Sequence, residues 1–554
     1  MTSPDAIEIA YTPVPSGTTG DESLESKALV DSVAHDAAEQ HDLTVRQAIK
    51  CYRWAIFWCL AVSMTVIMEG YDANLLNNFW AYPTFQRKYG NWVGVSETTR
   101  SGYQLTPAWQ AALGNGAGIG SFFGALADGY LVRRFGPRNT ILGALVVMIF
   151  CVFGVFFAQN IETLLAGQIL CGLPWGVFAS SSPAYASELL PMKLRVYFTS
   201  WTNICFIIGQ LLSAGVLRAC LVRDDEWAYR IPFALQWFWP LWLIPLLSFA
   251  PESPWHLVRK GRHEEAERSL RRLQDADAPL STQETLAYIV HTNNLEQKLL
   301  SVGTGYRDCL RGVELRRTEI ACLSFAGQVL CGTALAYNAT YFYEQIGFPA
   351  SRIYNLNLGG YFLALAGAFC SWFLLLPHFG RRTIFLWGSG VMCLLLYLIA
   401  VLTSWKSQRG VAETQAYLTM AWKFVYQLSA GQLGWAIPAE VGSTRVRQNT
   451  VVLARNAYYL VHIVGNILQP YFMNPTAWNV GARTGFLWGS TALLFFIWLF
   501  WRLPETKDRT YEELDILFAK RTPARKFRSA KVDVFGHEAH ELKACHPPDL
   551  DTRH

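Results

Sequence analysis

Long runs of apolar residues alternate with short polar segments along most of this chain. A helix needs about 20 mostly apolar residues to cross the hydrocarbon core of a bilayer. Runs of that kind begin near Arg53, Pro107, Asn139, Glu162, Val196 and Ile231. A second set begins near Thr318, Ile353, Thr383, Gln415, Thr450 and Arg483. The pattern predicts an all-α integral membrane protein with 12 transmembrane helices, arranged as two six-helix bundles.

Polar segments mark the expected domain boundaries. Residues 1–50 are rich in Ser, Asp, Glu and Thr, which predicts a disordered tail. Residues 51–250 and 317–503 should form the two bundles, and residues 251–316 a central loop with helical patterns such as "RHEEAERSLRRL". Residues 504–554 form a C-terminal tail.

The distribution of basic residues predicts the orientation in the membrane. If both termini are cytosolic, about 35 of the 47 Lys and Arg residues lie in cytosolic segments and about 10 outside. The short turns "LVRRFGPR" and "FGRR" follow the same rule. We therefore expect cytosolic termini and a multi-pass membrane location, with the plasma membrane as the membrane concerned.

Composition narrows the class of function. Hydrophobic residues make up 52% of the chain and charged residues only 16%, against about 25% in soluble proteins. The net charge of +5 is small and no long basic run occurs, so we expect the lipid bilayer and no nucleic acid as a partner. We find no nucleotide-binding loop, metal cluster or nucleophile constellation. The sequence therefore favours a monomer that is not an enzyme and needs no cofactor or metal.

Several spans contain closely spaced glycines, as in "GNGAGIGSFFG" and "GQILCGLPWG". Small residues let membrane helices approach closely. Two interpretations stay open: tight static packing, or surfaces that slide during a rocking motion.

Two carboxylic acids interrupt the first span. Glu69 and Asp72 are spaced i, i+3 and share one helical face. A charge at mid-bilayer costs at least about 2.5–3.5 kcal/mol, so such a residue indicates function. A buried carboxylate suits a proton carrier. The alternative is that both acids meet water near the outer end of the helix.

Six motifs resemble those of the sugar porter family of the major facilitator superfamily. They are "GALADGYLVRRFGPR", "PAYASELLPMKLR", "PESPWHLVRKGR", "HFGRR", "AEVGSTRVR" and "PETKDRTYEEL". Longer stretches such as "EGYDANLLNNFWAYPTFQRKYG" and "LARNAYYLVHIVGNILQPYFMNP" resemble the fungal maltose (α-glucoside) permease branch. The resemblance covers nearly all of the membrane portion.

The resemblance implies a secondary active transporter that imports a sugar, an α-glucoside or oligosaccharide, by proton symport through alternating access. The proton gradient would be the driving force. It assigns proton coupling to Asp72, with Glu69 as a second candidate. Two other functions stay open: transport of a different polyol or glycoside-like metabolite by symport or uniport, and a non-transporting sugar receptor.

The chain departs from the wider family at the usual charge partner of the coupling aspartate. Many proton-coupled sugar porters carry an arginine in the fourth span where this chain has Gln168. Lys423 and Arg455 are the two basic residues within the spans. Arg455 resembles an intramembrane arginine of the fungal branch, so we favour it as charge partner or substrate ligand. It could instead extend to the inner interface.

A sugar site needs amide and aromatic side chains, because sugars present hydroxyls and apolar ring faces. The resemblance places such residues at Gln168, Asn203, Gln210, Gln328, Tyr337, Asn338, Tyr341, Gln432, Trp435 and Arg455. Two family amides are replaced, by Val329 and Ala334. The alternative for each polar side chain is a hydrogen bond between helices.

Charged residues at the cytosolic helix ends are expected to form a gate. The family pattern pairs carboxylates with arginines there, at Asp128, Arg138, Glu188, Arg195, Arg381, Glu440 and Arg447. Each exposed pair is worth about 0–1 kcal/mol, and a network can bias a two-state equilibrium. The alternative is that the arginines serve only as positive-inside anchors.

Overall fold

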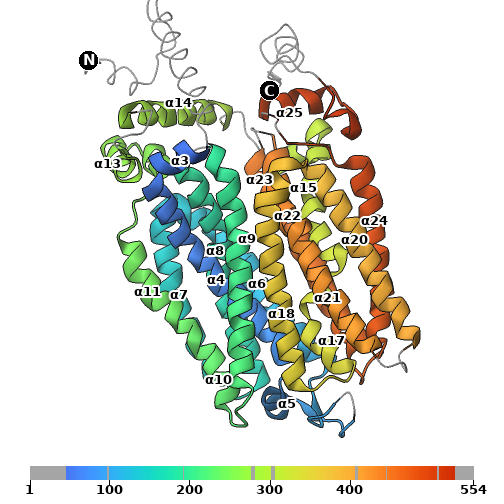
Figure 1. Ribbon diagram of the computed structural model, residues 1–554. Helices are drawn as coiled ribbons and strands as arrows, with labels where there is room; N and C mark the ends of the chain where they lie inside the picture. The colour runs from blue at the N-terminus through green and yellow to red at the C-terminus, as the bar shows by residue number, and fades with distance from the viewer. Residues whose placement is uncertain are drawn as a thin grey trace, which may run out of the picture. The chain divides into compact units, whose positions relative to one another are not determined.

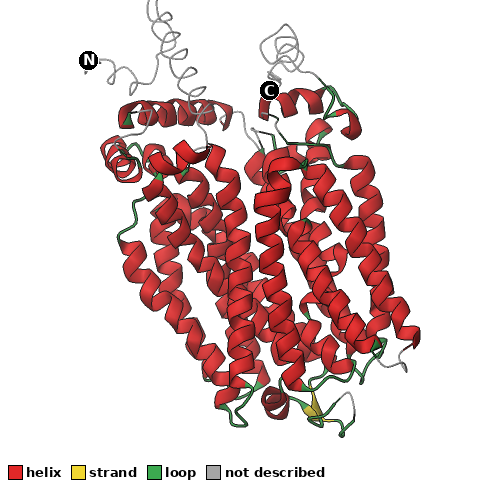
Figure 2. Ribbon diagram, in the orientation of Figure 1, coloured by secondary structure: helices red, strands yellow, loops and turns green. Residues whose placement is uncertain are grey.

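The computed structural model describes residues 45–96, 99–190, 192–275, 281–300, 306–405, 410–443, 446–507, 509 and 511–530. Most of these residues are helical, as Figure 2 shows. The strands in the described part are β1 (Asn91–Trp92) and β2 (Tyr103–Gln104), which pair antiparallel. The two expected tails lie largely outside the described residues.

Six helical segments follow one another in the first half of the chain. They are α4 (Arg53–Phe79), α6 (Pro107–Phe135), α7 (Pro137–Phe156), α8 (Ile161–Leu189), α9 (Met192–Cys220) and the pair α10 (Trp227–Ala234) and α11 (Phe238–Ser248). A 3-10 turn, Leu235–Trp237, joins α10 to α11. Each segment begins within a few residues of the start that the apolar runs predict.

The second half also forms six segments, and three of them consist of more than one helix. They are α15 (Gly312–Gln328) with α16 (Ala334–Tyr337) and α17 (Ala339–Gln345), α18 (Ala350–Cys370) with α19 (Leu376–His378), α20 (Arg381–Leu402), α21 (Val411–Leu428) with α22 (Ala430–Val441), α23 (Arg447–Met473) and α24 (Thr484–Arg502). Ten helical segments in the described chain are long and apolar enough to cross a membrane. The two expected spans outside that set are α6 and α21–α22.

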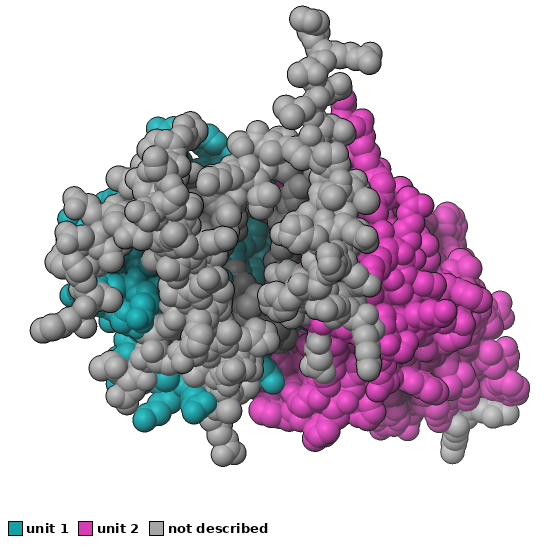
Figure 3. Space-filling view, turned by 90° about the horizontal axis from the view of Figure 1, so that it is seen from above, with its two compact units in different colours: residues 1–73, 116–210, 230–303 teal, residues 74–115, 211–229, 304–554 magenta. Residues whose placement is uncertain are grey.

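Contacts divide the chain into two compact units, coloured separately in Figure 3. Unit 1 comprises residues 1–73, 116–210 and 230–303, and unit 2 comprises residues 74–115, 211–229 and 304–554. The division cuts through α4, α6 and α9, because one end of each packs with helices from the second half of the chain. The hydrogen bond from Tyr354 to the carbonyl of Asn78 (2.7 Å) is one such contact within unit 2.

In unit 1, short helices cover the cytosolic end of the spans (Figure 1). They are α3 (Val45–Cys51), α12 (Pro254–Arg259), α13 (His263–Leu273) and α14 (Thr282–Leu300). Apolar residues of α12, α13 and α14, including Leu257, Leu270 and Ile289, form a small buried core. The central loop is therefore a packed subdomain and not only a linker.

In unit 2, short elements lie at opposite ends of the spans. Helix α25 (Tyr511–Ala519) lies at the cytosolic end, and α5 (Pro83–Tyr89) with the β1–β2 hairpin lies at the other end (Figure 1). Arg317 of α15 holds α25 through Asp515, with an N···O distance of 2.5 Å.

Glycines bring α6 and α8 into backbone contact within unit 1. A Cβ at Gly120 would lie 2.1 Å from the carbonyl oxygen of Ile169, and one at Gly172 would lie 2.3 Å from that of Ala117. Any larger residue would separate these helices. The glycine runs in the sequence therefore form a helix interface, as small residues do in membranes.

Candidate functional site

Asp72 is the most buried acid of the first span. Its side chain, 1% exposed, lies in unit 1 about two-thirds of the way along α4. The amide of Gln236, from the turn between α10 and α11, donates a hydrogen bond to Oδ1. Oδ2 has no partner among the described residues. No cation within the described chain forms an ion pair with Asp72, so its charge is balanced only by amide dipoles.

Gln168 is the residue that the resemblance places where many sugar porters carry an arginine. It is fully buried on α8 and lies close enough to act on the Asp72 carboxylate. Its amide atoms form no hydrogen bond of good geometry with any described residue. The side chain beside the Asp72 carboxylate is therefore an amide, whereas the family resemblance led us to expect a guanidinium. Gln236 was not identified from the sequence, because no motif marks it and only the fold brings it to Asp72.

The remaining unit 1 candidates lie on α4 and on the helix that crosses it closely. Glu69 is half-buried, one turn before Asp72. A Cβ at Gly209 of α9 would lie 2.0 Å from the carbonyl oxygen of Ile67, so α9 and α4 touch through their backbones. Asn203 and Gln210 are buried on α9, on either side of the crossing.

Two spans in unit 2 are discontinuous. Between α15 and α16 the chain makes a wide turn at Val329–Thr333, where Gly332 has φ 96°, a conformation that favours glycine. Between α21 and α22 the helix breaks at Ser429. Broken helices in transporters place polar groups at substrate sites. Gln328 and Gln432 lie beside these two breaks.

Amide and aromatic side chains gather beside the breaks. Tyr426 donates a hydrogen bond to Gln328 Oε1 (3.1 Å), and Gln427 donates to the hydroxyl of Tyr337 (2.9 Å). The amide of Gln432 is 1% exposed and both of its polar atoms lack partners within the described chain. This cluster offers hydrogen-bonding groups and ring faces together, which is what a sugar requires.

Arg455 lies among aromatic rings of the same unit. Its guanidinium carbon is 4.3 Å from the centre of the Trp435 ring and 5.4 Å from that of Tyr459. Its Nε donates to the Tyr459 hydroxyl at 3.4 Å. Phe325 contacts Trp435 edge to face, with ring centres 5.5 Å apart. The arginine is therefore held by cation–π contacts inside the span, and the geometry does not match a side chain reaching freely to the interface.

Tyr341 and Asn338 have structural partners. The Tyr341 hydroxyl donates to Gln104 Oε1 (2.9 Å), beside the β1–β2 hairpin. The Asn338 amide donates to the carbonyl of Ala334 (2.8 Å), one turn back. For these two side chains the structure favours the alternative of a packing hydrogen bond.

Lys423 forms a buried polar cluster that the sequence did not predict. Its side chain is 1% exposed, donates to Asn357 Oδ1 at 3.3 Å and lies 4.1 Å above the Tyr361 ring. Tyr361 in turn donates to Asn74 Oδ1 (2.5 Å). The cluster joins the end of α4 to α18 and α21 within unit 2, and within the described chain it contains no acid paired with the lysine.

The gate residues differ from the expected carboxylate–arginine pairs at Asp128. Its carboxylate accepts hydrogen bonds from the hydroxyls of Ser180 (2.7 Å) and Ser181 (2.6 Å), both on α8. Arg138 instead donates to the carbonyls of Leu247 and Ser248. In this structure Asp128 is therefore held by hydroxyl donors of α8, and its role in a gate with arginine stays a prediction.

The other gate residues fall into two groups. Glu188 accepts from Ser253 and from Arg259 (3.1 Å), and Glu440 accepts from Thr506 (2.5 Å) and pairs with Arg381 (3.5 Å). The two expected residues Arg195 and Arg447 lie in α9 and α23, but their side chains are outside the described part.

The two halves repeat one contact at this cytosolic end. Glu252 Oε1 accepts from the backbone N–H of Arg138 (3.2 Å) at the start of α7. Glu505 Oε1 accepts from the backbone N–H of Arg381 (2.7 Å) at the start of α20. Burial raises the pKa of Glu252, which lies in the loop after α11. The motifs "PES" and "PET" thus each supply a carboxylate to a helix N-terminus.

Comparisons with known proteins give the family of the chain. The profile of the family described as "Sugar (and other) transporter" matches residues 58–518. The general alpha-glucoside permease of Saccharomyces cerevisiae is 36% identical over 504 residues, which is 90% of this chain and 81% of the relative. Maltose permease MAL31 of the same organism is 37% identical over 93% of this chain and 84% of its own.

Solved structures share the fold. The inward-open xylose transporter XylE from E. coli aligns with a TM-score of 0.67 at 19% identity, over 84% of this chain and 99% of its own. The expected twelve-helix all-α membrane fold is confirmed by this likeness together with the helices described above. Within the described residues no group of His, Cys, Asp and Glu could hold a metal ion. The chain belongs to the sugar transporter family, with the major facilitator fold, and is a transporter rather than an enzyme.

Proposed function

We propose that this protein imports an α-glucoside together with a proton, by alternating access driven by the proton gradient. Two relatives that are 36% and 37% identical to this chain over the aligned residues are named as an alpha-glucoside permease and a maltose permease. A solved structure with the same fold is described as a proton:xylose symporter. We further propose a monomer in the plasma membrane.

The burial of Asp72 carries the coupling part of the proposal. A carboxylate that is 1% exposed within a span, with amide donors and no cation partner among the described residues, is costly when charged. Taking up a proton removes that cost. Asp72 would therefore carry the proton, and Gln236 and Gln168 would stabilise the charged form without the arginine that other sugar porters use.

The cluster beside the two helix breaks supports the sugar part. Gln328, Gln432 and Tyr337 offer hydrogen-bonding groups, and Trp435 offers a ring face beside Arg455. Burying the Gln432 amide without hydrogen-bond partners costs free energy, unless the hydroxyls of a ligand form hydrogen bonds with it. We assign these residues to the glucoside, with Arg455 orienting Trp435 and donating to sugar oxygens.

The experiment is uptake of labelled maltose, sucrose, trehalose and glucose in a transport-deficient yeast, with external pH recorded. We expect α-glucoside uptake accompanied by alkalinisation of the medium. In Asp72→Asn, accumulation and alkalinisation should disappear while exchange of labelled for unlabelled sugar continues. The matched control Asp224→Asn, in an exposed outer loop, should behave as the parent protein.

The alternatives predict different results in the same assay. Uptake of a polyol or another glycoside in place of these sugars would support the second substrate class. Uptake without alkalinisation would indicate uniport. No uptake by a correctly located protein would contradict the proposal and favour a receptor.

A further inference from the structure

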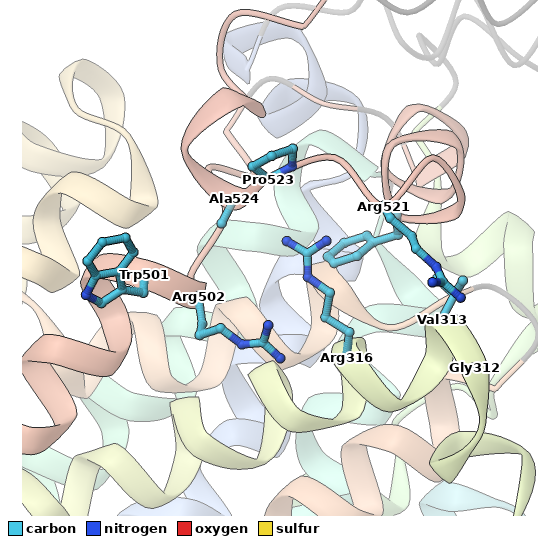
Figure 4. Close-up of a pocket in the computed structure, with 9 residues that line it drawn as sticks. Gly312, Val313, Arg316, Trp501, Arg502, Arg521, Pro523 and Ala524 are labelled. Carbon is cyan, nitrogen blue, oxygen red and sulfur yellow. The ribbon is translucent and has the colours of Figure 1, made fainter.

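A cavity of about 370 Å³ opens at the cytosolic end of unit 2, away from the transport residues. It lies between the start of α15, the end of α24 and the segment that follows α25 (Figure 4). Its lining includes the guanidinium groups of Arg316, Arg502 and Arg521, together with Trp501 and Phe518. None of the lining residues is acidic.

The segment after α25 adds further positive charge. Residues 520–530 read "KRTPARKFRSA", with five basic and no acidic residues. Clusters of four to eight basic residues just cytosolic to a transmembrane helix are typical of sites for anionic lipids.

Specific contacts hold this basic segment against the spans. Arg316 donates to the carbonyl of Thr522 at 2.9 Å, and Arg509 donates to that of Ala530 at 2.5 Å. The guanidinium of Arg525 lies 4.2 Å from the ring centres of both Phe500 and Trp501. The backbone of the segment and the guanidinium of Arg525 are therefore held at the end of α24.

The positive charge at the cavity is only partly balanced. Glu319 pairs with Arg502, and Asp515 pairs with Arg317. No carboxylate of the described chain forms an ion pair with Arg316, Arg521 or Arg525. A guanidinium without a carboxylate partner is suited to bind phosphate oxygens.

Apolar side chains at the cavity and next to it are exposed. Trp501 is 62% exposed and Phe500 is 41% exposed at the last turn of α24, and Leu315 of α15 is 49% exposed. Tryptophan is enriched at membrane–water interfaces. A ligand that fits both sides has a polyanionic head and an apolar body.

We propose that this cavity binds the phosphorylated headgroup of an anionic lipid from the cytosolic leaflet. The phosphates lie beside Arg316 and Arg521 in the cavity, Arg525 adds its charge from the adjoining segment, and the acyl chains extend along Trp501 and Phe500. The site is separate from sugar and proton transport, and its occupancy does not depend on which solute is carried.

Binding is measured on the purified full chain in detergent, by fluorescence polarisation of labelled dioctanoyl phosphatidylinositol bisphosphate. In the double variant Arg521→Gln with Arg525→Gln, we expect about 25-fold weaker binding, since each Lys or Arg near an anionic surface contributes about fivefold. The matched control removes the same charge from exposed positions on α13, by Arg262→Gln with Arg268→Gln. It should bind as the parent protein does.

A charge-conserving variant separates binding from folding. Arg521→Lys with Arg525→Lys keeps the net charge and should bind within about fivefold of the parent, losing only bidentate contacts. Equal weakening in the α13 control would overturn the proposal, because it would indicate non-specific attraction. Soluble inositol trisphosphate that competes as strongly as the unlabelled lipid would also overturn it, because the ligand would then be a free phosphate compound.

Discussion

The contact between α6 and α8 allows a matched test of glycine packing. Gly120 and Gly118 lie two residues apart on the same helix. A Cβ at Gly120 would be 2.1 Å from the carbonyl oxygen of Ile169, whereas a Cβ at Gly118 would meet nothing within 4 Å. Both substitutions to Ala gain the same helix propensity, up to about 1 kcal/mol. The difference between them therefore isolates the steric effect.

The size of that effect follows from the distances. Ordinary van der Waals contact begins at 3.4 Å, so the Ala methyl at position 120 requires the two backbones to separate by about 1.3 Å. The obstacle is a backbone carbonyl, which cannot rotate away as a side chain does. Overpacking of this kind costs about 1–3 kcal/mol. We expect Gly120→Ala to lower the thermal midpoint by about 1–3 °C relative to Gly118→Ala, because the shift per kcal/mol becomes smaller in a chain of 554 residues.

The assay is thermal unfolding of the purified protein in detergent, followed by a thiol-reactive dye, together with sugar uptake in cells. Equal midpoints for the two variants would refute the reasoning, since the close approach would then be absent or freely relaxed. Loss of uptake in Gly120→Ala at an unchanged midpoint would point instead to a sliding surface.

Three further predictions concern charged groups. Lys423→Met should change the thermal midpoint little, because the cost of burying the ammonium, about 2.5–3.5 kcal/mol, is offset by its contacts with Tyr361 and Asn357; a large loss of stability would contradict this. A double-mutant cycle of Arg381→Gln and Glu440→Gln, measured by unfolding, should give a coupling of about 0.5–1 kcal/mol, and zero coupling would show that the pair is only adjacent. Burial raises the pKa of Glu252 above its ordinary 4.5, so the folded state binds the proton more tightly and stability should fall as pH rises from about 4.5 through the folded-state pKa. Glu252→Gln should remove that fall, and an unchanged pH profile would contradict the assignment.

Much of the fold could be predicted from the sequence because the bilayer imposes one local rule. A span must be about 20 residues long, apolar and helical to satisfy its backbone. The starts at Arg53 and Pro107 were predicted to the residue for this reason. The packed subdomain formed by α12–α14 was only partly predicted, since helical patterns do not indicate which faces will meet.

The functional residues also fall into two groups: those that a short segment of the sequence reveals, and those that only the fold brings together. Asp72 could be identified from the sequence because a charge within an apolar run is conspicuous by itself. Its partner Gln236 lies 164 positions further along the chain and looks like any polar residue near a helix end. The helix breaks at Gly332 and Ser429 likewise have no unique sequence signal, although they position Gln328 and Gln432.

The sequence by itself determined the helix count and the presence of a buried acid, because each depends on composition within a short segment, and it predicts the orientation from the basic residues. Only the tertiary structure decided which groups surround Asp72 and that the carboxylate of Asp128 meets serine hydroxyls. It also decided where the basic segment 520–530 packs against the spans. Those features depend on contacts between segments far apart in the chain. Hydrophobic patterning places a residue in the membrane, but helix packing selects its neighbours.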